Sequence, residues 1–262
     1  MQFNFDLISD LHVETWPDFD WTNQATSPYC VVIGDVAKDR KLLIETLRHL
    51  GRCYQGVFYI DGNDEHKNYW DGLGQSYREL SNYVDKIKNV VFMQDNVVIV
   101  NGVALLACNG WWSFDFNPAI DQTQTYAWFK HRYGVDDVTV GAITSLAIND
   151  AAYMANSVKK VQKHQDVKKI IMVTHTVPAP WLVSHDIDLE DHYRFNCTGN
   201  PHMQLALDND TENKISHWCF GHYHRPVDRE FSGIRWVNNC RGRGDTPWKQ
   251  EVYYPKRITV DY

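Results

Sequence analysis

Short apolar runs alternate with segments of helical periodicity along most of the 262-residue chain. Apolar runs of this kind are typical of buried strands, whereas apolar residues spaced three and four apart are typical of helices that pack on a sheet. Because the two patterns follow one another repeatedly, the chain is predicted to form a layered α/β fold.

Ten apolar segments are predicted to be strands: residues 3–8, 29–33, 56–60, 89–93, 97–100, 103–107, 169–173, 217–220, 234–237 and 252–258. Asn101 and Gly102 join two of these segments, and this dipeptide favours the two-residue turn of an antiparallel hairpin. Parallel neighbouring strands need a crossover connection, which is usually a helix, and the helical segments between the other strands supply it. We therefore expect mixed sheets.

Three helices are predicted between the strands. Apolar positions 43, 47 and 50 indicate a helix that begins near Asp39 and ends at Gly51, and positions 77, 80, 84 and 87 indicate a second. The stripe from Ile143 to Val161 indicates a third, longer helix. Residues 109–137 are expected to form an insertion or long loop with a short helix. No repeat, low-complexity tract or linker interrupts the chain, which favours a single domain over residues 1–262.

The charge balance and the cysteines limit the cellular context. Lys and Arg number 26 and Asp and Glu number 33, a net charge of −7 that offers no basic field for stable binding of long nucleic acid. No apolar run reaches the about 20 residues of a membrane-spanning helix, and the start of the chain lacks a signal-peptide pattern, so we expect a cytoplasmic protein without a membrane partner. The six scattered cysteines are expected to be reduced and mostly buried.

Polar side chains follow five of the predicted strands, at the point where each strand ends. They are Asp10, His12, Asp35, Asn63, His175, His222 and His224. Binding sites in layered α/β folds form where the carboxyl ends of strands meet, so these side chains should converge. Asp10 and His12 are two residues apart, as are His222 and His224, and such pairs project to the same side of an extended segment.

This ordered set of Asp-x-His, Gly-Asp, Gly-Asn, a strand-ending His and Gly-His-x-His resembles the motifs of the calcineurin-like metallophosphoesterases. The resemblance extends over nearly the whole chain and implies a two-sheet mixed β-sandwich flanked by helices. It also implies that one metal ion is held by Asp10, His12, Asp35 and His224. The other ion would be held by Asp35, Asn63, His175 and His222, so that Asp35 bridges the pair.

The resemblance implies a dinuclear hydrolytic enzyme. Carboxylate, amide and imidazole ligands suit Mn²⁺ or Fe, with Zn²⁺ as a further candidate. Two divalent ions about 3.5–4 Å apart activate a bridging hydroxide and neutralise the charge on the attacking and leaving oxygens. The expected reaction is therefore the hydrolysis of a phosphoester, with no serine or cysteine nucleophile.

One position departs from the family pattern. Asp64 stands where the family has a histidine that binds phosphate or protonates the leaving group, next to Asn63. An aspartate with an ordinary pKa near 3.9 is an anion at neutral pH and a poor proton donor. His66 could replace it, or substrates with good leaving groups need no acid, or the enzyme is weakened. Asn63, Asp64 and His66 are the candidate catalytic residues.

Other residues are candidates for substrate binding. Trp111 and Trp112 lie in an aromatic stretch that either packs in the core or stacks on a nucleobase. Asn109 follows a predicted strand, and Arg241 and Arg243 follow another and could fork onto a phosphate, although solvated arginines explain them nearly as well.

The predicted function is a phosphodiesterase that acts on a small, nucleotide-like phosphoester. A phosphomonoesterase or protein phosphatase is the nearest alternative. A weakly active or non-catalytic metal-binding scaffold is the alternative from another class, because Asp64 replaces the family histidine. A nuclease for short single strands is a further alternative that would use the aromatic stretch.

Overall fold

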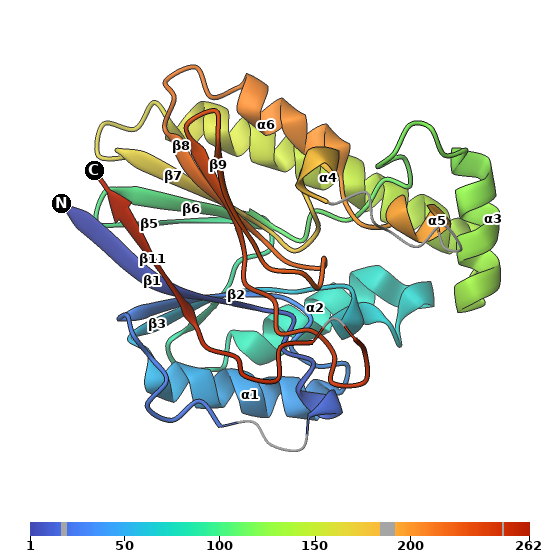
Figure 1. Ribbon diagram of the computed structural model, residues 1–262, viewed down its shortest axis with the longest axis horizontal. Coiled ribbons are helices and arrows are strands. Elements are labelled where there is room, and N and C mark those ends of the chain that lie inside the picture. The colour runs from blue at the N-terminus through green and yellow to red at the C-terminus, as the bar shows by residue number, and fades with distance from the viewer. Residues whose placement is uncertain (17–19, 184–191, 248) are drawn as a thin grey trace.

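Two β-sheets lie face to face, and helices cover their outer faces (Figure 1). The computed structural model describes residues 1–16, 20–183, 192–247 and 249–262. In the first sheet the strand order is β11-β1-β2-β3-β4. The strands are β1 (Gln2–Ser9), β2 (Tyr29–Ile33), β3 (Gly56–Ile60), β4 (Val90–Phe92) and β11 (Lys256–Asp261). The first four are parallel, and β11 pairs antiparallel with β1.

The second sheet has the order β5-β6-β7-β8-β10-β9. Its strands are β5 (Asn96–Val100), β6 (Val103–Cys108), β7 (Lys169–Thr174), β8 (Ile215–Phe220), β9 (Val227–Phe231) and β10 (Ile234–Asn238). The four central strands are parallel, whereas β5 and β9 form antiparallel edges. The β5–β6 hairpin turns at Asn101 and Gly102, both of which have positive φ, as the dipeptide predicted.

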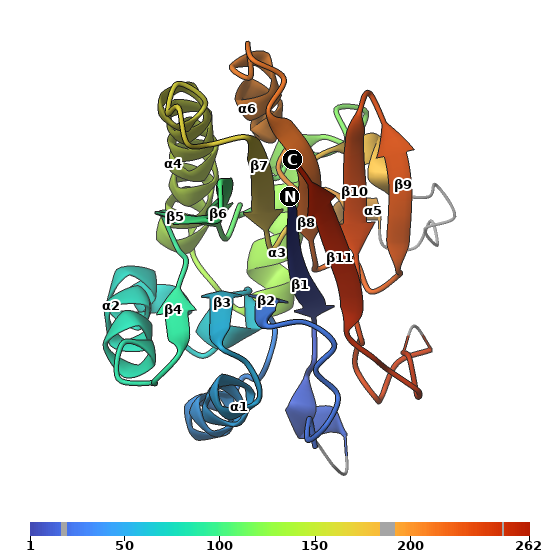
Figure 2. The same cartoon turned by 90° about the vertical axis from the view of Figure 1, so that its left-hand side faces the viewer.

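One apolar core lies between the two sheets, which face each other in Figure 2. Side chains on a strand alternate between its two faces, so Phe3, Phe5 and Leu7 of β1 all point into this layer. They meet Leu105 and Val173 from the other sheet. The opposite faces of β2 and β3 pack against helices α1 (Arg40–Cys53) and α2 (Leu73–Val84).

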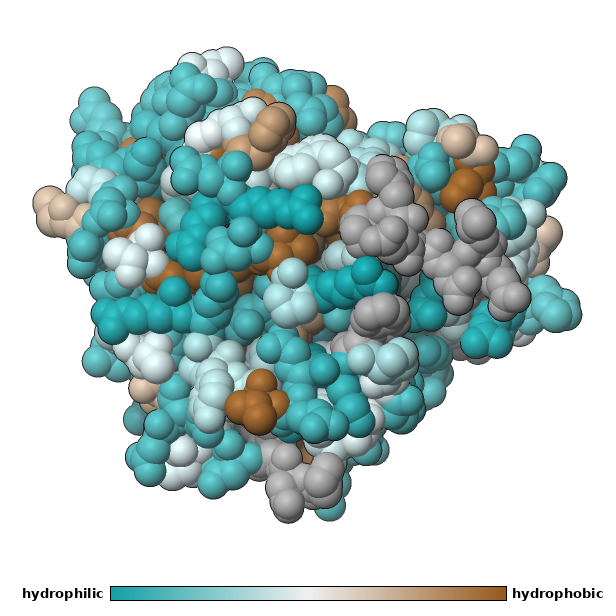
Figure 3. Space-filling view, in the orientation of Figure 1, coloured by the Kyte–Doolittle hydropathy of each residue, from teal (hydrophilic) through white to brown (hydrophobic). Residues whose placement is uncertain are grey.

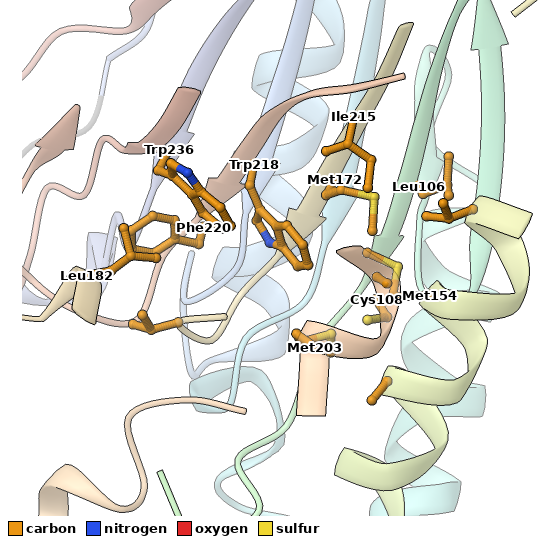
Figure 4. Packing of buried hydrophobic residues seen from close by; sticks show 14 of the residues in the cluster. Leu106, Cys108, Met154, Met172, Leu182, Met203, Ile215, Trp218, Phe220 and Trp236 are labelled. Atoms are coloured by element: carbon orange, nitrogen blue, oxygen red, sulfur yellow. The ribbon is translucent and has the colours of Figure 1, made fainter. Parts of the chain in front are cut away.

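A second apolar layer lies on the outer face of the six-stranded sheet. There α4 (Asp137–Val161) and α6 (Gln204–Asp208) cover β6, β7 and β8. Figure 4 shows Met154 of α4 among Leu106, Met172 and Trp218 of these strands. The long stripe predicted from Ile143 to Val161 is therefore the buried face of α4.

The remaining helices are short. They are α3 (Gln122–Tyr133), α5 (His192–Phe195) and the 3-10 turns Val13–Thr15, Asp64–His66, Trp70–Gly72, Pro180–Leu182 and Pro201–Met203. The predicted helical segment within residues 109–137 corresponds to α3. Asp39, Asp121 and Asp136 each accept a hydrogen bond from a backbone N–H in the first turn of α1, α3 and α4. Such caps explain where these helices begin.

The predicted α/β architecture, a mixed two-sheet sandwich flanked by helices, is confirmed. Two local predictions are wrong, and one strand was missed. Gly51 does not end α1, which continues to Cys53. The last predicted strand starts at residue 252, but β11 starts at Lys256, after Pro255. Strand β9 was not predicted, because four of its five residues are exposed and its sequence has no apolar run.

The surface and the cysteines agree with the composition. The face in Figure 3 is hydrophilic over most of its area. All six cysteines lie within the described residues and none is in a disulfide, and all but Cys53 are buried. Among the residues that the structure describes, no helix is both long and apolar enough to cross a membrane.

Candidate metal centre

The carboxyl ends of both sheets bring the predicted ligands together at one place. Two groups of predicted ligands have ligand atoms within 4.8 Å of one another. The first group is Asp10, His12, Asp35 and His224, and the second is Asp35, His175 and His222. Asp35, which follows β2, belongs to both groups and is the natural candidate for a bridging ligand.

The first group surrounds one side of Asp35. His12 Nε2 lies 3.7 Å from Asp35 Oδ2 and 3.1 Å from His224 Nε2. His224 Nε2 lies 3.3 Å from Asp10 Oδ1. These nitrogen and oxygen atoms are close enough together to bind one ion.

The second group uses the other oxygen of Asp35. His175 Nε2 lies 3.5 Å from Asp35 Oδ1 and 3.2 Å from Asn63 Oδ1. The structure thus adds Asn63, which follows β3, to this group. Because the two oxygens of Asp35 face different groups, one carboxylate can serve two neighbouring ions.

Backbone carbonyls select the imidazole nitrogen that is free to bind a metal. Ile33 O lies 3.3 Å from His175 Nδ1, and Cys197 O lies 3.0 Å from His222 Nε2. A carbonyl accepts only from a protonated nitrogen, so the free lone pair is on His175 Nε2 and on His222 Nδ1. These outer partners orient both rings in the way that metal-binding histidines require.

The backbone at the site is strained. Asp10, His12, Asp35 and His222 have φ values of +51°, +42°, +48° and +63°. Left-handed conformations are uncommon for residues with a side chain, cost about 1–3 kcal/mol each, and gather at functional sites. Four of the seven candidate ligands are therefore held in conformations that the rest of the fold must impose.

Two glycines let the strand ends approach one another. A Cβ atom on Gly62 would lie 2.3 Å from Asp35 Oδ1 and 2.8 Å from His175 Cε1. A Cβ atom on Gly221 would lie 2.7 Å from Asp10 Oδ2. Any larger residue at either position would displace a candidate ligand.

The electrostatics of the ligands fit divalent cations. Burial lowers the pKa of His12 and His175, and burial together with His175 lowers the pKa of His222 to about 3. These imidazoles are therefore neutral, as metal binding requires. Burial and the neighbouring carboxylates of Asp64, Glu65 and Asp10 raise the pKa of Asp35 well above its usual range. Bound cations would supply the positive charge that this buried carboxylate needs.

Glu65 joins the two loops that carry Asp35 and Asn63. Its carboxylate accepts hydrogen bonds from the backbone N–H groups of Asp35 (3.0 Å), Val36 (2.7 Å), Ala37 (3.4 Å) and Gly62 (2.7 Å). The side chain is buried. Glu65 therefore fixes the relative position of two ligand loops without facing a ligand group, and it was not among the predicted site residues.

Asp64 lies behind His12 and within a set of cations. Asp64 Oδ2 lies 3.4 Å from His12 Nδ1, on the side of the ring opposite to the ligand atom. Lys38, Lys67 and Arg243 each place a nitrogen 3.4 Å from its carboxylate. Although burial alone would raise it, His12 and the lysines hold the pKa of Asp64 below its ordinary value. Asp64 is thus a carboxylate that lies next to His12 Nδ1, on the side of the ring away from the ligand group.

The structure does not bring His66 to the ligands. The ring is fully buried, with Nδ1 2.8 Å from Ser76 Oγ and Nε2 2.9 Å from Asp61 Oδ2. Both nitrogens are engaged within the core, so these contacts do not support the hypothesis that His66 replaces the family histidine as an acid. Asn109 is also buried and donates to Asp61 Oδ2 at 2.7 Å, and its carbonyl accepts from His175 N at 2.8 Å. It supports the site and has no face for substrate.

The two tryptophans are core residues, which favours core packing over the alternative that they stack on a nucleobase. Trp111 is fully buried and donates to Tyr77 Oη at 2.6 Å. Trp112 is 3% exposed and stacks on His222. Arg241 places its guanidinium 4.1 Å from the centre of the Trp16 ring, whereas Arg243 reaches Asp64. Of the two arginines, Arg243 is the one beside the candidate site.

Comparison with solved structures supports this architecture. The chain is similar to the crystal structure of phosphopantetheinyl hydrolase from Mycobacterium tuberculosis, with a TM-score of 0.69, 17% identity, and coverage of 97% of this chain and 95% of that one. It is also similar to a putative 5′-nucleotidase from Staphylococcus aureus, with a TM-score of 0.51 and 14% identity. That match covers all of this chain and 51% of the nucleotidase.

These likenesses define the fold of the chain, which is the calcineurin-like fold. No protein-family model and no curated protein sequence matches the chain. The site residues are therefore assigned from their geometry in this structure.

Proposed function

We propose that the chain is a metal-dependent phosphoester hydrolase, and specifically a phosphodiesterase for small nucleotide-like substrates. The observation that carries the proposal is the position of Asp35, whose two oxygens face two separate groups of ligands. The names of the two similar structures, a phosphopantetheinyl hydrolase and a putative 5′-nucleotidase, support hydrolysis of a phosphoester.

The proposed ligands are the seven residues predicted from the sequence, and their mixture of oxygen and imidazole donors suits Mn²⁺ or Fe, with Zn²⁺ as a further candidate. Two such ions supply an activated water and neutralise charge at the phosphoryl group. The chain itself contributes the alignment: Glu65 fixes the loops, and the carbonyls of Ile33 and Cys197 fix two of the imidazoles. Asp64 lies next to His12 Nδ1, on the side of the ring away from the ligand group.

Asp64 favours a diester over a monoester. A carboxylate in contact with three cations has no proton to give to a leaving group. The enzyme should therefore prefer substrates whose leaving group is stable as an anion. A diester carries one negative charge and a monoester nearly two at neutral pH, because the second pKa of a phosphate is about 6. Asp64 cancels part of the positive charge of the surrounding cations, and a monoester, with its larger negative charge, loses more attraction by this than a diester does.

The test compares two activated esters on the full chain with added Mn²⁺. Hydrolysis of bis-p-nitrophenyl phosphate should exceed that of p-nitrophenyl phosphate, and Asp35→Asn should reduce it by at least about a thousandfold. Asp121→Asn is the matched control, because Asp121 only caps α3 and asparagine caps equally well.

The other outcomes point to the alternatives. A clear excess on the monoester would indicate a phosphomonoesterase or protein phosphatase. No turnover of either ester with any divalent ion, followed by activity in Asp64→His, would indicate a non-catalytic metal-binding scaffold.

A further inference from the structure

Three cations surround the carboxylate of Asp64 and form what we call the cationic collar: Lys38, Lys67 and Arg243. Lys38 Nζ and Arg243 Nη1 lie 3.4 Å from Asp64 Oδ2, and Lys67 Nζ lies 3.4 Å from Asp64 Oδ1. The collar comes from three separate segments, after β2, after β3 and after β10. Its convergence on one carboxylate is therefore a property of the folded chain.

The three positive charges of the collar exceed the negative charges of the carboxylates that they contact. Arg243 also forms a two-point contact with Asp245, at 3.1 and 3.2 Å. Among the described residues, Lys38 and Lys67 have ion pairs with Asp64 alone. Two lysines thus share one carboxylate, which is only 5% exposed, while the lysines are 27% and 34% exposed. Both ammonium groups can reach an anion from solvent.

The collar lies next to the candidate metal centre. Asp64 Oδ2 is 3.4 Å from His12 Nδ1, and the opposite nitrogen of the same ring faces the first ligand group. The carboxylate of Asp64 and the imidazole ring of His12 therefore lie between the collar and the first ligand group. The collar borders the candidate metal centre.

His12, Asp64 and Glu14 could also be considered as a third metal site, since their ligand atoms lie within 4.8 Å of one another. The three cations of the collar already contact Asp64. A further cation there would be repelled, so the collar is better suited to an anion.

We propose that the cationic collar binds the leaving phosphoryl group of a pyrophosphate-linked substrate, in which two organic groups are joined through a phosphoanhydride. This inference rests on the proposed phosphoester hydrolysis and names its substrate class. The observation behind it is geometric: three cations gather at one carboxylate beside the candidate metal centre, where an anionic leaving group would meet positive charge. Charge-assisted hydrogen bonds from lysine and arginine stabilise the negative charge that develops on that group.

The reaction balances without another reactant. The oxygen of one water molecule bonds to the first phosphorus, and the bond from that phosphorus to the bridging oxygen breaks. The bridging oxygen leaves with the electron pair on the second phosphoryl group. The products are two phosphomonoesters, which share the two protons of the water with the solvent.

The test uses two substrates that differ in the presence of the second phosphoryl group. Diadenosine diphosphate joins two adenosines through a pyrophosphate, and adenylyl-(3′→5′)-adenosine joins two adenosines through one phosphate. For the Mn²⁺-loaded full chain, kcat/KM should be at least about a hundredfold higher for the pyrophosphate. Lys38→Met and Lys67→Met should each lower this ratio about tenfold.

Two further variants serve as comparisons. Lys67→Arg should keep most of the ratio, because it keeps the charge. Lys41→Met should keep all of it, because Lys41 is 84% exposed on α1 and lies outside the collar. A variant that is partly unfolded or short of metal loses activity on both substrates, so the ratio is insensitive to such damage.

A ratio near one in the wild type, or a ratio that both lysine variants leave unchanged, would overturn the collar assignment. If bis-p-nitrophenyl phosphate is hydrolysed in either case, only the pyrophosphate inference fails. If no ester is hydrolysed with any divalent ion, the proposed function fails with it.

Discussion

The indole ring of Trp112 lies against the imidazole of His222, with ring centroids 5.6 Å apart and planes inclined by 19°. The second constraint on this imidazole is the carbonyl of Cys197, 3.0 Å from its Nε2. The stack fixes the plane of the ring and the carbonyl fixes its rotation. Together these contacts fix the direction of His222 Nδ1 without a bound metal. An aromatic core residue, Trp112, thus helps to shape the candidate site.

Replacing Trp112 should weaken metal binding through His222. Trp112→Leu removes the stacked ring, whereas Trp112→Phe keeps an aromatic face. We expect the leucine variant to bind Mn²⁺ at least about tenfold more weakly than the phenylalanine variant, because partners that orient a metal-binding histidine contribute this much. Isothermal titration of both variants measures the difference.

Trp236→Leu is the control for the loss of a buried indole. Trp236 stacks on Trp218 in the outer apolar layer, away from the ligands. The Trp236→Leu substitution should lower the free energy of unfolding while leaving the affinity for Mn²⁺ unchanged. Equal affinities in the two Trp112 variants would contradict the role of the stack.

Glu65 should be essential for the stability of the ligand loops. In Glu65→Gln an amide NH₂ replaces one oxygen and faces backbone N–H donors, which leaves buried donors unpaired. The free energy of unfolding should fall by about 3 kcal/mol, as measured by urea denaturation. Glu45→Gln, at an exposed position of α1, should change it by less than about 0.5 kcal/mol. Similar values for both variants would contradict this role.

His217 on β8 should make the fold sensitive to acid. Burial, with Arg235 and Lys169 nearby, lowers its pKa to about 4, whereas the ordinary value is 6.5. Between these values the unfolded chain binds a proton that the folded chain does not. The contribution of His217 to the free energy of unfolding is therefore fully present above pH 6.5. It is lost as the pH falls toward 4, which lowers the free energy of unfolding by about 2–3 kcal/mol.

The measurement compares urea denaturation at pH 7.5 and pH 4.5, with EDTA present so that metal release does not contribute. His217→Gln should lose about 2–3 kcal/mol less stability than the wild type over this interval. His164→Gln, at a site 56% exposed, should behave like the wild type. If His217→Gln and the wild type lose the same amount, the buried imidazole is not the sensor.

The ligand positions could be predicted because they depend on local order in the chain. Asp10, Asp35 and His175 each follow a buried apolar strand, and parallel strands deliver their carboxyl ends to one edge. The meeting of Asn63 with His175 does not follow from this rule, because Asn63 follows β3 in the first sheet and His175 follows β7 in the second. The sandwich was expected only from the resemblance of the motifs.

The supporting residues could not be predicted, because their roles depend on packing in three dimensions. In the sequence, nothing distinguishes Lys38 and Lys67 from ordinary exposed lysines, and only the fold brings them to Asp64. His66 lies two residues after Asp64 and could reach the site by its position in the sequence, but both its ring nitrogens contact buried side chains, those of Ser76 and Asp61. Gly51 resembles a helix stop, whereas a Cβ atom there would lie 2.7 Å from the carbonyl of Lys88, so close packing explains it.

The central claim is that Asp35 joins two ions. The direct measurement is the number of Mn²⁺ ions bound per chain, from equilibrium dialysis with elemental analysis, in the wild type and in Asp35→Asn. We predict two ions for the wild type and at most one, weakly held, for the variant. A wild type that binds a single ion, or an Asp35→Asn variant that retains two with unchanged affinity, would contradict the account.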